Sequence, residues 1–345
     1  MQIVYIIGKE FFPNIANGKD IIFIEYRKQK YCNLLKKLVW YIIRTYRAYS
    51  GARTCHWGAR ILFGDNFVDE LRKITHEDKV LIWDIPSIKT NIMLHQELDT
   101  DEVMTFLWNP VCSLYKSRFS LWKFLHYKEK YHFLYSTFDS YDARKHNMML
   151  LPQVFDLNHL RQFVNDNTEK AILYDVTFLA ALKGREYEIY KTYERLKDEE
   201  LIAFFYLFHP NTRIRIPEVL RNFLHTEKMQ YDSYIKQASR SKAILEIVQK
   251  GQEGMSLRPL EALMLKKKLI TNNLSMVNEK IYHPDNVYIL NYPNKYHSIK
   301  EFLEAPYVEI PEELKKGHDI RVWMRQNVIY APFSKNNNCR CKNSD

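Results

Sequence analysis

The sequence has few of the features that mark secreted, membrane-spanning or disulfide-stabilised proteins. It has no run of about 18 uncharged apolar residues, which argues against a membrane-spanning helix. The N-terminus lacks the basic segment and long apolar core of a signal peptide, so we expect a cytoplasmic protein. The cysteines are odd in number and scattered, which argues against a disulfide framework; they lie at positions 32, 55, 112, 339 and 341.

The chain has an ordinary globular composition with a clear basic excess. Hydrophobic residues make up 46% and charged residues 27% of the 345 residues, and the formal net charge is +10. A basic protein favours anionic partners, which include nucleic acid, phosphorylated substrates and an anionic membrane leaflet. The polar end of the chain, 334–345, is predicted to be a disordered tail.

Short apolar runs alternate with longer amphipathic runs, which is typical of a parallel sheet covered by helices. The alternation is clear from about residue 172 onward, where "ILYDVTFLA", "LIAFFYLF", "AILEIV", "KLITNN" and "VYIL" are the predicted strands. It is weaker in the N-terminal half, where "QIVYII", "KVLIWDI", "TFLWN" and "HFLYSTFD" are the candidates. We therefore predict an α/β fold with two Rossmann-like domains.

The predicted domain boundaries are based on this alternation and on the chain length, since domains usually have roughly 100 to 200 residues. They are an N-terminal domain at 1–150, a linker at 151–170, a C-terminal domain at 171–297, and helices at 298–333 that could return to the N-terminal domain.

The segment "EGMSLRPLEALMLKKKLITNN", residues 253–273, carries two glutamates around a predicted helix start. Ser256 is a good N-cap and Pro259 is tolerated in a first turn, so Glu253 falls in the preceding loop and Glu261 just inside the helix. A loop at the carboxyl end of a parallel strand that opens into a helix is a favoured ligand site. The alternative is two ordinary surface acids.

This segment resembles the donor-binding signature of GT-B glycosyltransferases, in which two glutamates are separated by seven residues. The wider chain is similar to bacterial glycosyltransferases of lipopolysaccharide and capsule biosynthesis. The resemblance is carried by "STFDSYDARKHNMMLLPQVF", "YDVTFLAALKGRE" and "SRSKAILEIVQKGQEGMSLRPLEAL". It implies two Rossmann-like domains facing across a cleft, with an acceptor-side N-terminal domain and a nucleotide-sugar-binding C-terminal domain.

By this resemblance Glu261 would bind ribose hydroxyls and Glu253 would lie near the donor sugar. The residues that would face the diphosphate are Gly254, Met255, Ser256 and Arg258, with Gly184 and Arg185 of "LKGRE" as further candidates. An ordinary helix start with a solvated arginine is the alternative for "LKGRE". The chain departs from the signature at Lys266–Lys268, where Gly-Lys-Pro is usual, and it lacks a clearly Gly-rich loop after the first strand.

No metal site or cofactor is expected beyond the nucleotide-sugar substrate. Asp99 and Asp101 match the metal-binding D-x-D of GT-A enzymes, but they precede an apolar run, whereas that motif normally ends one; a solvated turn is the alternative. Cys339 and Cys341 lack a second ligand pair at zinc spacing.

An inverting glycosyltransferase needs a general base in its N-terminal domain, whereas a retaining one does not. Three acids end apolar runs there and are the candidate bases, namely Asp84, Asp139 and Asp142, each with a cap or turn role as the alternative.

The function expected from these features is sugar transfer to a lipopolysaccharide, O-antigen or capsule saccharide, which could be lipid-linked. Residues 32–49 fit an interfacial helix that would bring the protein to a membrane surface, with a core helix as the alternative. The rival function is a non-catalytic basic α/β protein that binds nucleic acid or an anionic surface. An inactive protein with the same fold is a third interpretation.

Overall fold

The computed structural model describes two compact units. One is Met1–Pro152 together with the chain from Trp323 onward, and the other is Gln153–Val322. The described residues are 2–12, 15, 20–27, 34–50, 56–165, 171–211 and 213–333. The predicted tail, with Cys339 and Cys341, lies outside them.

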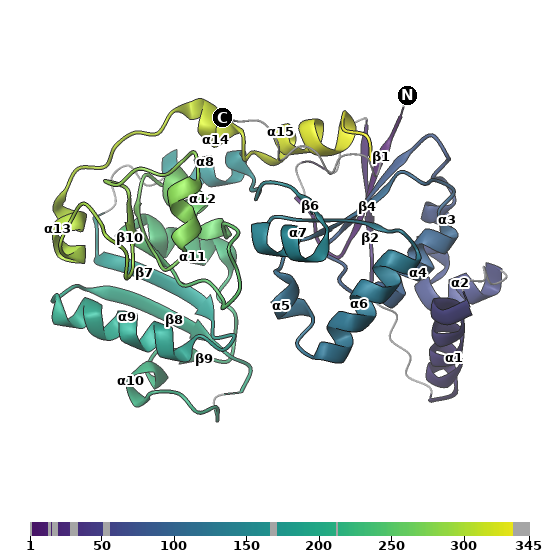
Figure 1. The fold of residues 1–345 in the computed structure, drawn as a ribbon, viewed down its shortest axis with the longest axis horizontal. Helices are drawn as coiled ribbons and strands as arrows, with labels where there is room; N and C mark the ends of the chain where they lie inside the picture. Colours follow the sequence, from purple (N-terminus) through teal and green to yellow (C-terminus); the bar gives the residue numbers. More distant parts are fainter. Residues whose placement is uncertain are drawn as a thin grey trace. The chain divides into compact units, whose positions relative to one another are not determined.

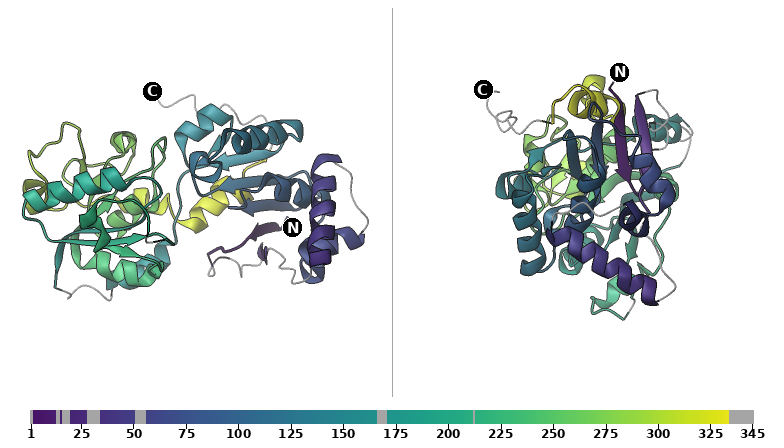
Figure 2. Two further views of the ribbon diagram at one scale, coloured as in Figure 1. Left: turned by 90° about the horizontal axis from the view of Figure 1, so that it is seen from below. Right: turned by 90° about the vertical axis from the view of Figure 1, so that its right-hand side faces the viewer.

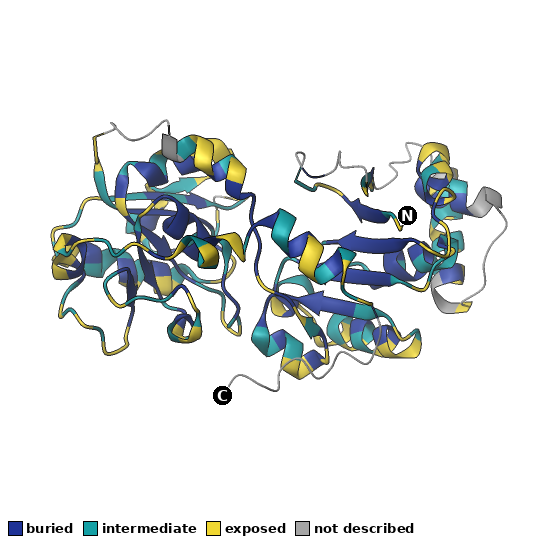
Figure 3. Ribbon diagram, turned by 90° about the horizontal axis from the view of Figure 1, so that it is seen from above, coloured by how far each residue is buried: buried dark blue, intermediate teal, exposed yellow. Residues whose placement is uncertain are grey.

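The N-terminal unit is built on a parallel sheet of six strands in the order β2-β1-β3-β4-β5-β6 (Figure 1). The strands are β1 (Val4–Gly8), β2 (Ile21–Glu25), β3 (Lys79–Trp83), β4 (Val103–Leu107), β5 (Leu134–Thr137) and β6 (Met149–Leu150). The inner strands β1, β3 and β4 are buried along their whole length, which explains their nearly continuous apolar sequences (Figure 3).

Helices cover one face of this sheet, and α4 lies between α1 and α6. The helices of the unit are α1 (Leu34–Ser50), α2 (His56–Phe63), α3 (Asp65–Leu71), α4 (Ile88–Glu97), α5 (Val111–Leu114), α6 (Arg118–Lys130) and α7 (Ser140–His146). Val80 and Ile82 of β3 point to this helical face and join its core. Because side chains alternate along a strand, Lys79 and Trp83 point to the other face.

The segment from Trp323 to Phe333 packs on that second face. α15 (Ile320–Met324) leads into a π-helical turn, η2 (Arg325–Ile329), and the yellow C-terminal segment lies beside the N-terminal strands (Figures 1 and 2). Trp323 is fully buried, with its ring 5.9 Å from that of Trp83. Lys79 donates to the carbonyl groups of Val328, Ile329 and Ala331 at 2.8–3.2 Å. The partners of this buried lysine thus lie about 250 positions away in the sequence.

The C-terminal unit has a second parallel sheet of six strands, in the order β12-β11-β10-β7-β8-β9. The strands are β7 (Tyr174–Ala181), β8 (Ala203–Phe208), β9 (Leu224–His225), β10 (Ser241–Glu246), β11 (Lys268–Thr271) and β12 (Val287–Ile289). Read from β9, this is the strand order 3-2-1-4-5-6 of a Rossmann fold.

Two apolar cores lie on opposite faces of this sheet. One core joins α8 (Leu157–Asn165), α11 (Tyr231–Ser239), α12 (Leu257–Met264) and α14 (Glu312–Lys316). The other core joins α9 (Glu186–Asp198), α10 (Glu218–Arg221) and α13 (Ile299–Glu304). The short 3-10 helix η1 (Leu274–Asn278) follows β11.

The predicted fold class, α/β with two Rossmann-like domains, is confirmed by these two sheets. Sequence reasoning missed the short strands β6 and β9 and the edge strand β2. The segment 151–170 was predicted to be a linker, but Leu157 and Leu160 of α8 are buried in the C-terminal core, so this helix belongs to that unit. No helix in the described ranges is both long and apolar enough to cross a bilayer.

Gly8 ends β1 directly beside Trp83, its register partner in β3. A Cβ atom at Gly8 would lie 3.1 Å from the Trp83 carbonyl oxygen, which the sheet holds in place. We therefore predict that Gly8→Ala lowers the free energy of unfolding by about 1–3 kcal/mol.

Urea denaturation would measure the change. Gly317→Ala is the matched control, because Gly317 has a helical backbone and its added Cβ would meet its nearest atom at an ordinary 3.5 Å. Equal, small effects of the two substitutions would contradict the prediction.

Candidate functional site

Each sheet has a switch point, where the chain reverses the direction in which it adds strands. It lies between β7 and β10 in the C-terminal unit and between β1 and β3 in the N-terminal unit. Ligands of open α/β sheets bind outside the carboxyl ends of the strands at such points. The loops at these two edges are therefore the candidate sites.

The loop after β7 turns sharply at Lys183 and Gly184, whose φ angles are 50° and 77°. Gly184 is exposed, and an added Cβ would meet no atom within 4 Å, so its backbone is open to approach. Its amide donates to the Glu186 carboxylate at 3.3 Å. This arrangement leaves space beside the main chain of the predicted "LKGRE" loop.

Arg185, in the same loop, is directed inward. Its guanidinium donates to the carbonyl groups of Ala181 at 2.5 Å, of Leu182 at 3.2 Å and of Ile247. Burial lowers the pKa of Arg185 to about 10, so it stays charged at neutral pH. Arg185 thus joins the carboxyl ends of β7 and β10, and its predicted approach to phosphate would require these bonds to break.

The loop after β10 is held by Glu246, a buried residue that sequence reasoning did not select. Its carboxylate accepts hydrogen bonds from Ser256 and from Thr271, the latter at 2.6 Å. Ser256 is the N-cap of α12, as predicted, and its hydroxyl oxygen accepts from the Arg258 amide at 3.2 Å. Asn273 donates to the Glu253 carbonyl at 3.1 Å, which fixes the middle of the loop.

On α12 the buried Glu261 forms an ion pair with the half-buried Arg258. The Tyr234 hydroxyl donates to Glu261 Oε2 at 2.9 Å, and the Arg258 guanidinium lies 4.1 Å from the centre of the Tyr234 ring. Glu261 is 1% exposed, and its other oxygen, Oε1, accepts no hydrogen bond within the described part of the chain. Desolvation of its hydroxyl and the Glu261 carboxylate both raise the pKa of the nearby Tyr231, although the residue as a whole is 39% exposed.

The predicted donor-binding residues therefore divide by exposure. Met255 is buried in the apolar core, so only its backbone could face a ligand. Gly254 is buried, whereas Glu253, Ser256 and Arg258 are half-buried at the loop surface. Sequence reasoning missed Glu246 and Tyr234; the one available signal was a charged residue inside the apolar run "AILEIV".

The switch point of the N-terminal sheet carries a cavity of about 470 Å³, lined by Lys9, Glu10, Phe11, Phe12, Trp83, Asp84, Pro86 and Trp108. The aromatic rings contact one another at right angles or tilted, with centroids 5.0 Å apart for Phe11 and Trp83 and 4.7 Å apart for Trp83 and Trp108. The size suits a sugar ring, and the aromatic lining was not anticipated from the sequence.

Asp84 is the one candidate base that lines this cavity. Its φ angle is 47°, an uncommon conformation for a residue other than glycine. Its carboxylate accepts from the Trp108 amide at 3.1 Å and the Asn109 side chain at 3.3 Å. The carboxylate is thereby fixed in orientation at the cavity wall.

The other two candidate bases are buried in structural positions. Asp139 is the N-cap of α7 and accepts from the Asp142 amide at 3.0 Å. Asp142 accepts from the Val111 amide at 2.7 Å, and burial raises its pKa to about 6. Both are at most 2% exposed, and both carboxylates accept from backbone amides at helix starts, which are structural roles.

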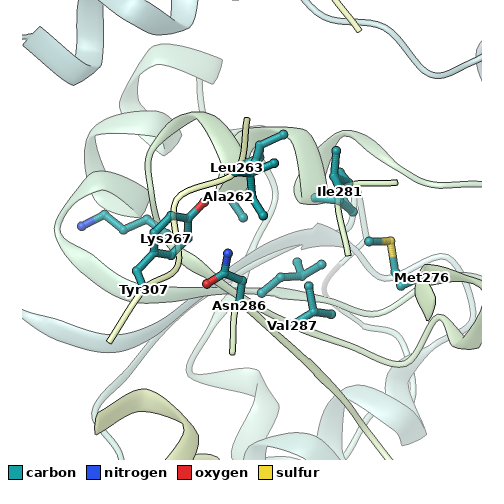
Figure 4. A pocket seen from close by; sticks show the side chains of 11 residues that line it. Ala262, Leu263, Lys267, Met276, Ile281, Asn286, Val287 and Tyr307 are labelled. Carbon is teal, nitrogen blue, oxygen red and sulfur yellow. The ribbon is translucent and has the colours of Figure 1, made fainter. Parts of the chain in front are cut away.

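Two further cavities do not overlap these edges. One of about 950 Å³ lies at the amino ends of β4 and β5 and includes Asp99 and Asp101, so the D-x-D match is at the opposite edge from the switch point. The other, about 20 Å³ between α12 and β11, has the size of a single water molecule (Figure 4). The described residues contain no group of three His, Cys, Asp or Glu side chains placed to hold a metal ion.

Comparison with solved structures finds likenesses at low sequence identity. A UDP-forming α,α-trehalose-phosphate synthase from Burkholderia vietnamiensis is 10% identical, with a TM-score of 0.54, over 95% of this chain and 97% of its own. The Burkholderia xenovorans enzyme, in complex with glucose-6-phosphate, has a TM-score of 0.49 at 10% identity, over 94% of this chain and 96% of its own. A glycosyltransferase from Rickettsia africae has a TM-score of 0.47 at 12% identity, over 97% of this chain and 99% of its own.

No protein-family model and no curated protein matches the sequence. The first of these likenesses supports the fold class, which is α/β with two Rossmann-like units as in the GT-B fold.

Asp142 should make stability depend on pH. Its raised pKa means that between about pH 4 and pH 6 the folded chain keeps a proton that the unfolded chain has released. The free energy of unfolding of the wild type, relative to Asp142→Asn, should therefore fall by about 2–3 kcal/mol as the pH rises from 4 to 7. Urea denaturation of both proteins across this range tests it, and a difference independent of pH would contradict it.

Proposed function

We propose that the chain is a metal-independent glycosyltransferase that moves a hexosyl or deoxyhexosyl group from a nucleotide-sugar donor to a saccharide acceptor. The acceptor class that we propose is lipopolysaccharide, O-antigen or capsule saccharide, handled in the cytoplasm or at the inner face of the cytoplasmic membrane. The trehalose-phosphate synthase with the matching fold is named for forming UDP, which supports transfer from a nucleotide donor.

The observation that carries the proposal is the fixed loop between β10 and α12. Glu246 and Asn273 hold Glu253 and the start of α12 at the switch point of the C-terminal sheet. A helix N-terminus there favours a diphosphate, and carboxylates accept hydrogen bonds from sugar hydroxyls. Glu261 Oε1, which is buried and accepts no hydrogen bond from the described residues, is a suitable acceptor for a ribose hydroxyl.

The two arginines at this edge are already paired with protein groups. Arg185 binds main-chain carbonyl groups, and Arg258 pairs with Glu261 and lies over Tyr234. In our proposal the diphosphate is therefore received mainly by backbone amides near Gly184 and at the start of α12, with both arginines behind them as fixed positive charges.

The acceptor in our proposal occupies the aromatic cavity of the N-terminal unit. Aromatic rings pack against the apolar faces of sugars, and Glu10 and Asp84 supply polar contacts at its wall. In an inverting transfer Asp84 takes the proton of the acceptor hydroxyl. The acceptor oxygen then forms a bond to the anomeric carbon of the donor sugar. At the same time the bond between the anomeric carbon and the diphosphate oxygen breaks, and the nucleoside diphosphate leaves with the bonding electrons.

Glu261→Gln should weaken nucleotide-sugar binding by about tenfold or more, because a neutral amide oxygen is a weaker acceptor for ribose hydroxyls. Titration calorimetry with the donor measures the change. Tyr234→Phe is the control, since it removes one hydrogen bond to Glu261 Oε2 but keeps the carboxylate. If Tyr234→Phe lowers the affinity as much as Glu261→Gln, Glu261 acts only through the structure.

Asp84→Asn should reduce transfer about a hundredfold or more while leaving donor affinity unchanged. The protein should remain folded, because asparagine tolerates a positive φ angle and can still accept from the Trp108 amide. Turnover assays of Asp84→Asn and of Glu10→Gln, which changes a second acid of the same cavity, test the assignment. Loss of transfer in Glu10→Gln alone would show that Asp84 is not the base.

A thermal-shift screen with UDP, GDP, CMP and TDP sugars would identify the donor class, since a bound ligand stabilises the folded chain. Tight binding of single-stranded nucleic acid at physiological salt, without any stabilising nucleotide sugar, would instead support the non-catalytic binding protein.

A further inference from the structure

The outward face of α1 is apolar along most of its length. The exposed side chains, each more than half accessible, are Leu35, Leu38, Tyr41, Ile42 and Tyr46. At 100° per residue they fall within an arc of about 140° on the helix. We call this arc the α1 outer face, and in the right-hand view of Figure 2 the purple α1 lies at the front of the N-terminal unit.

The α1 outer face is not the face that joins the core. Trp40 and Ile43 point the other way and pack against the apolar core beneath the helix. A surface helix usually has one apolar stripe opposite a polar one, whereas α1 is apolar on both sides. A contiguous exposed apolar face of this kind marks a site of interaction.

The sequence around α1 carries charge of a single sign. Between Glu25 and Asp65 there is no Asp or Glu, whereas Lys or Arg occurs at positions 27, 28, 30, 36, 37, 44, 47, 53 and 60. Some of these charges are used internally, since Arg47 pairs with Glu97 and Arg60 pairs with Asp65 and Asp69. Lys37 is exposed and borders the α1 outer face.

The positive charge around α1 distinguishes between two partners that could cover the α1 outer face, a second copy of the chain and a lipid bilayer. A second copy of the chain, paired by two-fold symmetry, would place the same acid-free segment against itself, and like charges across an interface oppose binding. An anionic bilayer offers the opposite charge together with an apolar interior, and tyrosines are favoured at its surface.

We propose that the α1 outer face docks the chain on an anionic lipid bilayer, with α1 lying in the plane of the interface. α1 has 17 residues and a mixed apolar and basic sequence, as surface-lying helices do. The purpose of the docking rests on the proposed function, because a lipid-linked acceptor would be presented at that surface; the docking itself requires neither a donor nor turnover.

Co-sedimentation of the full chain with vesicles tests the proposal. The vesicles are phosphatidylcholine alone and phosphatidylcholine mixed with an equal amount of phosphatidylglycerol. The wild type should sediment with the mixed vesicles only, and less so at high salt. Ile42→Glu should weaken this binding about tenfold or more, because it removes an inserted aliphatic side chain and adds a negative charge.

Ile202→Glu is the matched control, because Ile202 is also exposed, at 61% against 56% for Ile42, but belongs to the C-terminal unit. It should bind mixed vesicles as the wild type does. The proposal fails if the wild type binds neither vesicle, if Ile42→Glu binds normally, or if both variants lose binding equally. It also fails if light scattering shows a dimer that Ile42→Glu dissociates, since the face then covers a second copy.

Donor affinity of Ile42→Glu, measured by calorimetry, separates this inference from the proposed function. Unchanged affinity with lost vesicle binding supports docking through the α1 outer face. If the wild type binds the mixed vesicles through this face but binds no nucleotide sugar, the docking stands and the proposed transfer is wrong.

Discussion

The buried carboxylate of Glu246 is the constraint on which the carboxyl edge of the C-terminal sheet depends. It ends β10 and is 3% exposed, so without partners it would carry a large desolvation cost. Ser256 from the start of α12 and Thr271 from the end of β11 donate to it. Loss of a hydrogen bond to a buried charge costs about 1–3 kcal/mol or more, so the loop and two strand ends are fixed together.

The two arginines at the same edge of the sheet, Arg185 and Arg258, bind groups of the protein itself. Arg185 joins the ends of β7 and β10, and Arg258 joins α12 to Tyr234 of α11 and, at 3.3 Å, to the carbonyl group of Leu179 in β7. Burying a charge is favourable only where its hydrogen bonds are satisfied, and both guanidinium groups meet that condition largely through main-chain carbonyls and one carboxylate. The two arginines therefore hold the strand ends and α12 together at this edge. Because their positions are fixed, an anion bound nearby would be attracted to them without contacting them directly.

The sequence was sufficient for the fold and for part of the site, because both depend on local patterns. Apolar runs in the sequence predict the long central strands. A serine before a first turn that contains proline predicts the helix cap at Ser256. The short strands β6 and β9 have only two residues each and carry no pattern. The contact between Lys79 and the carbonyl groups of Val328 to Ala331 joins residues about 250 positions apart, and no local rule predicts it.

The roles of individual polar side chains were less predictable, for the same reason. Arg185 and Arg258 look like phosphate ligands in a one-dimensional sequence, but their direction depends on where strand ends and Tyr234 lie in space. Asp84, Asp139 and Asp142 are equivalent as acids after apolar strands. Only the folded chain separates one that lines a cavity from two that cap and support helices.

Asp84 shows how the N-terminal sheet holds one side chain in an uncommon backbone conformation. A positive φ angle is uncommon for residues other than glycine, although aspartate and asparagine adopt it more readily than most, and it persists where the surroundings determine it. Here the Asp84 amide donates to the Phe106 carbonyl while Trp108 and Asn109 hold the carboxylate. Phe106 lies in β4, and Trp108 and Asn109 follow directly after that strand, so the end of β4 fixes the carboxylate. Proton transfer to a positioned base requires this rigidity.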